Sequence, residues 1–212
     1  MNRRIWAQVS SSVLVALCLS GGVSAQTTDE APEALVKRLS TEVLDSIKSD
    51  KSIQGGDTGK VVTLVETKVM PHVNFERMTA SAVGPGWRQA TPEQRKRLQE
   101  EFKTLLVRTY AGALTQVTDQ VIFIKPVRAA AEDKEIVVRT EVKGRGDPIQ
   151  LDYRLEKTAG QGAGWKIFNI NVLGVWLVET YKSQFSQEIN AKGIDGLITL
   201  LSERNKSNAK KG

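Results

Sequence analysis

The stretch VMPHVNFERMTASAVGPGWRQATPEQRKRLQEEFKT, Val69 to Thr104, contains the clearest helix start and stop signals in the chain. Residues 75–83 are predicted to form a short helix that ends at Gly84-Pro85-Gly86, because glycine and proline interrupt helices. The following run, Thr91 to Gln94, predicts a longer helix, with a threonine cap, a proline in the first turn and a glutamine that completes a capping box. Apolar residues then recur on one broad face, so this helix is predicted to pack through one side.

Two further helices are predicted upstream. From Pro32 onward, apolar residues recur every four positions up to Ile47, which is the pattern of an amphipathic helix. Gly55 and Gly56 end this helix. Asp57 can cap a second helix, which Pro71 ends.

Downstream the apolar period changes from helical to alternating. Four strands are predicted in Val121–Ile124, Ile136–Val142, Ile149–Leu155 and Trp165–Leu173, the last with Phe168, Ile170 and Val172 on one side. Short turns between them favour an antiparallel meander, whose apolar face only the helices can cover. Residues 174–189 and 196–201 are predicted as helices on either side of Gly193. The expected fold class is α+β, a curved antiparallel sheet of about four strands covered by about six or seven helices.

The N-terminus has the features of a secretion signal. Arg3 and Arg4 precede an apolar run, and Val23-Ser24-Ala25 is a small-residue cleavage site, so residues 1–25 are predicted to be removed. The alternative, a membrane anchor, would need an apolar run of about 20 residues, which is longer than this one. Cleavage would also remove Cys18, the only cysteine, so no disulfide is expected. Residues 26–201 are predicted to form a single domain, and residues 202–212 a flexible basic tail.

Few residues suggest catalysis or metal binding. His72 is the only histidine, and no acid accompanies it in the sequence, so no catalytic residue, metal ligand or cofactor is predicted and the protein is not expected to be an enzyme. Asp152 and Glu156 alternate with apolar residues and are expected to be solvated. The formal net charge is +6, but basic and acidic residues are interspersed, which is typical of a solvated face and argues against nucleic-acid binding.

A set of ordered motifs resembles the MlaC family, also called toluene-tolerance proteins. The motifs are Met70–Phe75, Trp87–Arg95, Phe102, Thr109–Ala111, Trp165-Lys166, Gly174-Val175, Tyr181, Phe185 and Gly193–Leu197. The resemblance covers about residues 33 to 201. The chain departs from the family at Asn74, where an aspartate is expected, at Leu98, where many members have an aromatic residue, and at Lys182, near a frequent arginine.

The resemblance implies a soluble periplasmic phospholipid carrier that shuttles lipid between the outer and inner membranes and maintains outer-membrane lipid asymmetry. The implied partners are an outer-membrane lipoprotein–porin complex and an inner-membrane ABC transporter with an MCE-domain protein, and the carrier is expected to be a monomer. Phospholipid would be its only ligand, held in an apolar cavity between sheet and helices. Each candidate lining residue could equally be ordinary core, since both roles need an apolar side chain. The candidates are Met70, Val73, Phe75, Met78, Phe102, Leu106, Tyr110, Val138, Val142, Leu151, Tyr153, Ile167, Ile170, Val172, Val175 and Tyr181.

Two other functions are compatible with helices on a curved sheet. Cone-shaped domains of the nuclear-transport-factor type use this architecture, and some are isomerases or hydratases with an acid or base deep in the cone. The predicted inward face contains Thr140 and Tyr153 but no carboxylate, which argues against the enzyme. A periplasmic binding or interaction module with a filled core and no lipid is the remaining alternative.

Overall fold

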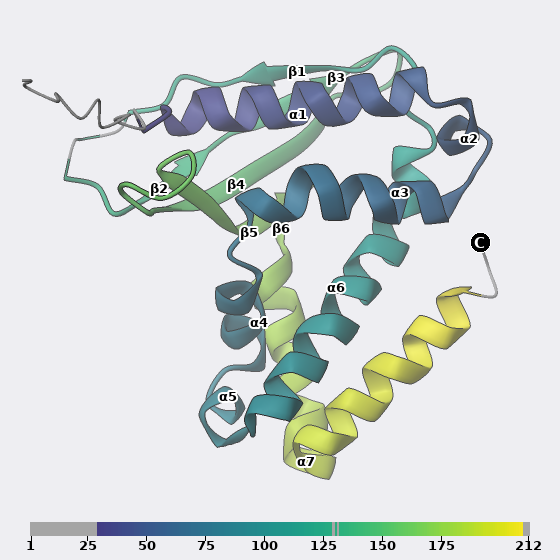
Figure 1. Ribbon diagram of the computed structural model, residues 1–212, viewed down its shortest axis with the longest axis vertical. Helices are drawn as coiled ribbons and strands as arrows, with labels where there is room; N and C mark the ends of the chain where they lie inside the picture. The colour runs from purple at the N-terminus through teal and green to yellow at the C-terminus, as the bar shows by residue number, and fades with distance from the viewer. Residues whose placement is uncertain (1–28, 129, 131, 210–212) are drawn as a thin grey trace, which may run out of the picture.

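The computed structural model describes residues 29–128, 130 and 132–209 (Figure 1). Within them a six-stranded sheet is formed by β1 (Val121–Ile124), β2 (Glu135–Val138), β3 (Thr140–Lys143), β4 (Ile149–Lys157), β5 (Trp165–Val172) and β6 (Val175–Trp176). The strand order is β1-β3-β4-β5-β6, with β2 paired to β4, and every pairing is antiparallel. The predicted α+β class, with helices on a curved antiparallel sheet, is therefore confirmed.

The predicted strand 136–142 is divided into β2 and β3 at Arg139, which is one reason why the sheet has more than about four strands. At the break, the Thr140 amide donates to the carboxylate of Asp152 at 3.2 Å, and the Thr140 hydroxyl donates to the Leu151 carbonyl. Asp152 also accepts a bond from the Gln150 side chain at 2.6 Å and is 3% exposed. The expectation that Asp152 is solvated was wrong, because its carboxylate takes the place of a backbone acceptor in the sheet.

A β-bulge in β5 interrupts the regular pairing of this strand with β4 at Phe168. The pairing of β4 with β5 shifts between Arg154↔Asn169 and Leu155↔Ile167, which leaves Phe168 without a partner residue on β4. Its ring lies 3.6 Å from the guanidinium carbon of Arg77. The prediction that Phe168 shares a side with Ile170 was wrong, because an extra residue breaks the alternation and bends the strand.

The helices are α1 (Pro32–Ser49), α2 (Lys51–Gln54), α3 (Thr58–Leu64), α4 (Phe75–Val83), α5 (Gly86–Gln89), α6 (Pro92–Leu114) and α7 (Leu177–Ala209). Between α3 and α4 the chain forms a π-helical turn, η1 (Val65–Val69), and a 3-10 turn, η2 (Met70–His72). The predicted starts are confirmed: the Asp57 side chain accepts from the Lys60 amide, and Thr91 and Gln94 form the capping box. Helix α4 ends at Val83 and is followed by Gly84, whose φ of 68° suits a residue without a Cβ.

The C-terminal helix differs from the prediction at both ends. Val175 and Trp176 form β6, because Leu173 and Gly174 make a tight turn with positive φ, and the helix begins only at Leu177. Gly193 interrupts the helix as predicted, with φ 69°. The helix then continues to Ala209, so the predicted flexible tail from residue 202 was wrong up to that residue. Asn205 is buried, and its side chain donates to the Glu101 carbonyl at 2.9 Å.

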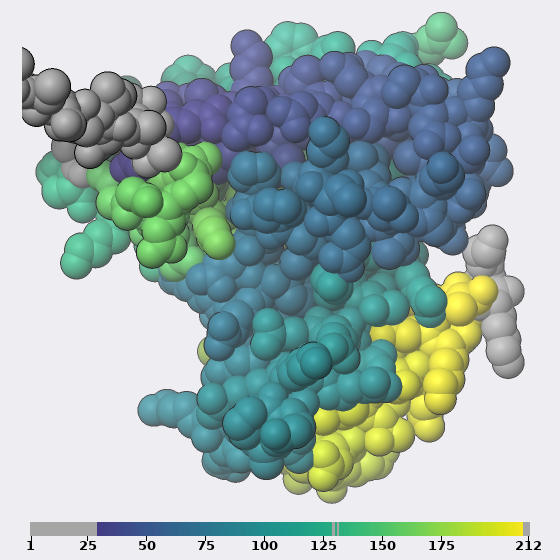
Figure 2. Space-filling view, viewed as in Figure 1, coloured from purple at the N-terminus to yellow at the C-terminus, as the bar shows by residue number. Residues whose placement is uncertain are grey.

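Buried apolar side chains gather in three clusters. The sheet cluster lies between α1 and the apolar face of the sheet; its members are Leu35, Val36, Leu39, Ile136, Val138, Tyr153, Leu155, Trp165 and Ile167. The helix cluster lies among α4, α6 and α7; its members are Met78, Ala82, Val83, Leu98, Phe102, Leu105, Leu177, Val178, Tyr181, Phe185, Leu197 and Leu201. A third cluster joins α1, α2 and α3 to the end of α6. In Figure 2, α1, α2, α3 and the sheet form an upper body, with α4 to α7 below.

The predicted signal peptide, residues 1–25, lies outside the described residues. No helix in the described part of the chain is both long and apolar enough to cross a bilayer.

Candidate functional site

The sheet cluster and the helix cluster meet at Ile170, a half-buried residue of β5 that packs against both. We call this boundary the interlayer seam; it runs between the apolar face of β4 and β5 and helices α4, α6 and α7. The chain crosses it near Val73, which pairs with Ile167, and the Asn74 amide donates to the Ile167 carbonyl at 2.8 Å. Two apolar surfaces from distant parts of the sequence therefore lie against each other here.

An aromatic group forms the helix side of the seam. Phe102, fully buried on α6, lies 5.7 Å from Phe75, 5.0 Å from Tyr181 and 5.2 Å from Phe185, measured between ring centroids. Tyr181 and Phe185 are four residues apart on α7, so their rings share one helix face. Burial raises the pKa of Tyr110 and of Tyr181, so both hydroxyls stay protonated at neutral pH.

The sheet side consists of aliphatic residues, Tyr153 and Trp165. Val138, Leu155 and Ile167 are almost completely buried beneath α1. Burial raises the pKa of Tyr153 to about 12, although the Ser40 side chain hydrogen-bonds to its hydroxyl. The sheet side is thus apolar and uncharged at neutral pH.

Most predicted lining residues lie in or against the two clusters. Val138, Tyr153 and Ile167 belong to the sheet cluster, and Met78, Phe102 and Tyr181 to the helix cluster; Val73, Phe75, Leu106, Tyr110, Leu151, Ile170 and Val172 pack against one or both. The other three do not join them: Met70 faces a surface cavity, Val142 pairs with Ile122 and Ile149, and Val175 is half exposed on β6. The predicted set omitted Phe185, although its spacing from Tyr181 signalled the shared face.

The seam is filled by side chains. Its central residues pack directly against one another, and two cavities of about 230 and 220 Å³ lie at the margin of the fold, both lined partly by charged residues. Trp87 packs against the helix cluster, and the guanidinium carbon of Arg95 lies 5.5 Å from the centre of its ring.

Comparison with known proteins identifies the family. The family model for the MlaC protein matches residues 37–203. The chain belongs to the MlaC family.

Individual relatives cover most of the chain. It is 26% identical over 200 residues to the intermembrane phospholipid transport system binding protein MlaC of Haemophilus influenzae, covering 93% of this chain and 92% of that one. It is 29% identical over 175 residues to the toluene tolerance protein ttg2D of Pseudomonas putida, covering 82% and 78%. The phospholipid-binding protein from Ralstonia solanacearum, solved in complex with a phospholipid, superposes with a TM-score of 0.80 at 47% identity, covering 84% of this chain and 98% of that one.

The polar face of the sheet in this MlaC-family protein carries paired charges. Glu156, expected to be solvated, accepts from the Asn74 side chain at 2.5 Å and from Arg77 at 2.5 Å, so that expectation was wrong. The Asn74 side-chain oxygen also caps α4. Because an amide can both accept and donate, asparagine serves here in two roles that an ionised aspartate could not combine.

A second polar group fixes the start of α7. The Asn169 oxygen accepts from the Val178 amide at 3.2 Å, and its nitrogen donates to Glu179 at 2.8 Å. Glu179 also pairs with Arg154, whose guanidinium lies 4.0 Å from the centre of the Trp176 ring. Burial alone would raise the pKa of Glu179, but the bonds from Asn169 and Arg154 outweigh it and lower the pKa.

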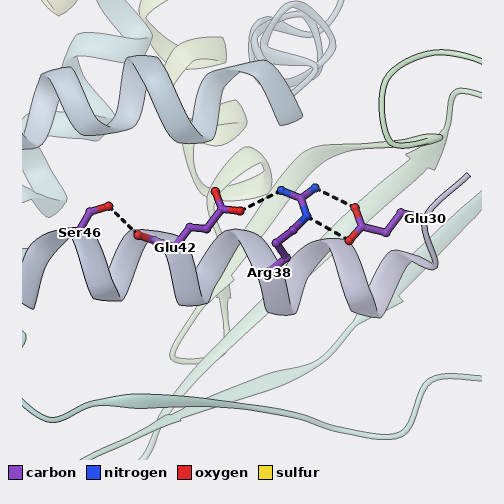
Figure 3. Close-up of polar contacts among 4 residues, drawn as sticks. All are labelled: Glu30, Arg38, Glu42 and Ser46. Carbon is purple, nitrogen blue, oxygen red and sulfur yellow. Dashed lines mark hydrogen bonds and ion pairs between the residues drawn. The ribbon is translucent and has the colours of Figure 1, made fainter. Parts of the chain in front are cut away.

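His72 lies near a charged group formed by Arg38 and Glu42 of α1 and by Glu30, which precedes α1. Arg38 donates to both oxygens of Glu30, at 3.1 and 2.8 Å, and to Glu42 at 3.2 Å (Figure 3). Partial burial and then the positive charge of Arg38 lower the pKa of His72, and the two glutamates oppose the shift. In the described part of the chain, no group of three or more His, Cys, Asp and Glu side chains is placed to hold a metal ion.

Proposed function

We propose that this protein is a phospholipid carrier that holds the acyl chains of its lipid in the interlayer seam. In the loaded state the apolar face of β4 and β5 covers one side of the chains, and the aromatic group of α4, α6 and α7 covers the other. The sixteen predicted lining residues remain the candidate contacts, with those packed around Ile170 at the centre. The carrier role needs no covalent chemistry, so we propose no enzymatic activity.

The observation that carries this proposal is the likeness to the Ralstonia protein, which was solved with a phospholipid bound. The likeness extends over 98% of that chain at 47% identity and a TM-score of 0.80, which supports a similar arrangement of sheet and helices in the two proteins. The relatives named for phospholipid transport and for toluene tolerance support the same role.

The energetics of lipid transfer explain why a carrier needs such a seam. Two acyl chains contain about thirty methylene groups, and each is worth about 0.8 kcal/mol when it leaves water. Carrying one lipid through water therefore requires shielding on the order of 20 kcal/mol of apolar exposure. Shallow surface contacts could not supply this, whereas two apolar layers that close around the chains could.

We further propose that the carrier works in the periplasm after removal of residues 1–25. It would receive lipid from an outer-membrane lipoprotein–porin complex and deliver it to an inner-membrane ABC transporter with an MCE-domain protein, as a monomer, and so maintain outer-membrane lipid asymmetry. The secretion signal in the sequence and the name of the Haemophilus relative, an intermembrane transport system binding protein, support this placement.

Native mass spectrometry of the mature protein purified from a periplasmic extract tests the proposal, followed by organic extraction and lipid analysis. We expect a stoichiometric mass increment equal to a phospholipid, whose extracted form also gives the number of acyl chains. A protein that is bare and also takes no lipid from vesicles would favour the lipid-free interaction module instead.

A further inference from the structure

A cavity of about 230 Å³ opens at the surface between η2, the first residue of α4 and the first half of α6. It is lined by Met70, Phe75, Lys96, Gln99, Glu100 and Lys103. Four of these residues lie on α6 within eight positions, where spacings of three, four and seven residues place side chains on one face. The cavity thus combines an apolar wall with a polar, charged one.

The apolar wall leads directly to the interlayer seam. Phe75 lines the cavity with one part of its surface and packs against the helix cluster with another. Its ring lies 5.7 Å from that of Phe102, the centre of the aromatic group. A molecule with its apolar part in the seam could therefore place a polar end in this cavity without crossing a polar layer.

The charges in the cavity are partly uncompensated. Lys103 forms an ion pair with Glu66 of η1 at 2.6 Å, so its charge is largely balanced. Lys96 and Glu100, although four residues apart, form no ion pair with each other or with any other side chain in the described part of the chain. Among the described residues, Lys96 and Glu100 thus place one unpaired cation and one unpaired anion beside the same cavity. The side-chain amide of Gln99, which lies between them in the sequence, donates to the Arg95 carbonyl at 3.4 Å and has a second hydrogen to donate.

We propose that this cavity binds the headgroup of the carried lipid, with a phosphate at Lys96 and Gln99 and an ammonium group at Glu100. The proposal rests on the carrier function proposed above and adds a preference for a zwitterionic headgroup of the phosphoethanolamine type. A lysine ammonium is a common phosphate partner, and a carboxylate accepts charge-assisted hydrogen bonds from an ammonium group. The π-helical turn η1, which leads directly into Met70, is a further feature often found at functional sites.

The test offers lipid-free protein a choice of lipids in one vesicle. The vesicles contain phosphatidylethanolamine and phosphatidylglycerol in equal amounts and a minor share of diacylglycerol, all with the same acyl chains. Protein is separated from the vesicles, its lipids are extracted, and their ratios are normalised to the vesicle composition. The variants are Lys96→Met, which keeps the apolar stem, and Glu100→Gln, which keeps the shape. Lys37→Met, an exposed lysine of α1, is the matched control.

We expect the unchanged protein and the Lys37→Met control to prefer phosphatidylethanolamine over phosphatidylglycerol, and both over diacylglycerol, by roughly threefold at each step, because Lys96 and Glu100 are exposed and exposed charges interact weakly. Lys96→Met should reduce the preference for both phospholipids over diacylglycerol. Glu100→Gln should reduce only the preference for phosphatidylethanolamine over phosphatidylglycerol.

Ratios that stay unchanged in both variants, with lipid still bound, would overturn the headgroup site and leave the carrier function standing. A protein that takes up none of the three lipids would contradict the carrier function itself. A parallel titration with soluble glycerophosphoethanolamine distinguishes a free compound from a lipid. Binding of that compound as tight as lipid uptake, and equally sensitive to Lys96→Met, would overturn the assignment to a lipid headgroup.

Discussion

Val172 and Val137 are both half-buried valines of the same sheet, but only Val172 packs against the helix cluster. If the seam holds the acyl chains, Val172→Phe should fill part of the space that they need, whereas Val137→Phe should not. We expect bound lipid per protein to fall severalfold for Val172→Phe and to stay unchanged for Val137→Phe. Each substitution should lower the free energy of unfolding by no more than about 3 kcal/mol.

Lipid extraction measures the occupancy, and urea denaturation checks that both variants remain folded. Full lipid occupancy in folded Val172→Phe would show that this position does not contact the lipid. The sequence alone could not distinguish the two roles of such a residue, since ordinary core and lipid lining require the same side chains.

The pKa of His72 allows a prediction of how the stability of the folded protein depends on pH. The pKa of His72 is lowered in the folded protein, by burial first and by Arg38 second, so the folded state favours the neutral ring. A histidine whose pKa is lowered by folding stabilises the folded protein fully at pH values above its ordinary pKa of about 6.5. This stabilisation is lost as the pH falls from about 6.5 toward the lowered pKa. Stability should therefore decrease from pH 7 toward pH 5. Because His72 is the only histidine, His72→Gln should flatten this part of the curve.

Urea unfolding midpoints across this range measure the effect. An equal slope in the His72→Gln variant would show that another group titrates there. Glu179, whose pKa is also lowered, contributes at lower pH, where carboxylates titrate.

At the scale of elements, the sequence predicted what is local and missed what depends on distant partners. The caps of α3 and α6 and the end of α4 were predictable because each signal lies within a few residues. The division between β2 and β3 was not, because it depends on a side-chain bond from Asp152, twelve residues away from Thr140. The bulge at Phe168 likewise depends on how β5 meets β4.

The last turns of α7 were missed for the same reason. Residues 202–209 are mostly polar, which is typical of a tail, but Asn205 donates to the carbonyl and the carboxylate of Glu101, at 2.9 and 2.7 Å. The Asn205 carbonyl in turn accepts from Arg108. These contacts join α7 to α6 over about a hundred residues of sequence, and no local pattern reports them.

Truncation tests the role of this segment. Deleting residues 203–212 removes Asn205 and should lower the free energy of unfolding by about 2–3 kcal/mol, since bonds to buried and charged partners are lost. Deleting residues 208–212 keeps Asn205 and should change it by less than about 0.5 kcal/mol. Chemical denaturation of the two truncated proteins provides the comparison, and equal stabilities would mean that the segment is indeed dispensable.

At the scale of the whole molecule, a lipid in the seam would contact both layers and so couple them. A ligand that binds only the folded state stabilises it by about 2.7 kcal/mol at a hundred times its dissociation constant. For a chain of this length, that corresponds to a rise in Tm of roughly 5–10 °C. We expect lipid-loaded protein to melt that much above stripped protein in calorimetry, and reloading should restore the difference. Equal melting temperatures would argue against lipid in the seam.

The edge strands of the sheet affect whether the protein aggregates at high concentration. An apolar surface that opens to exchange cargo could also recruit a second copy, and exposed strand edges are where chains aggregate. Here β1 has four residues, and Pro126, which has no amide hydrogen to donate, lies two residues after it. Strand β2, which pairs with β4, also has four residues. On the opposite side, β6 pairs with Asn171 and Val172 of β5, and farther along β5 the Asn74 amide donates to the Ile167 carbonyl. The short strands β1, β2 and β6 are poor templates for another strand, which favours a carrier that can open repeatedly without polymerising.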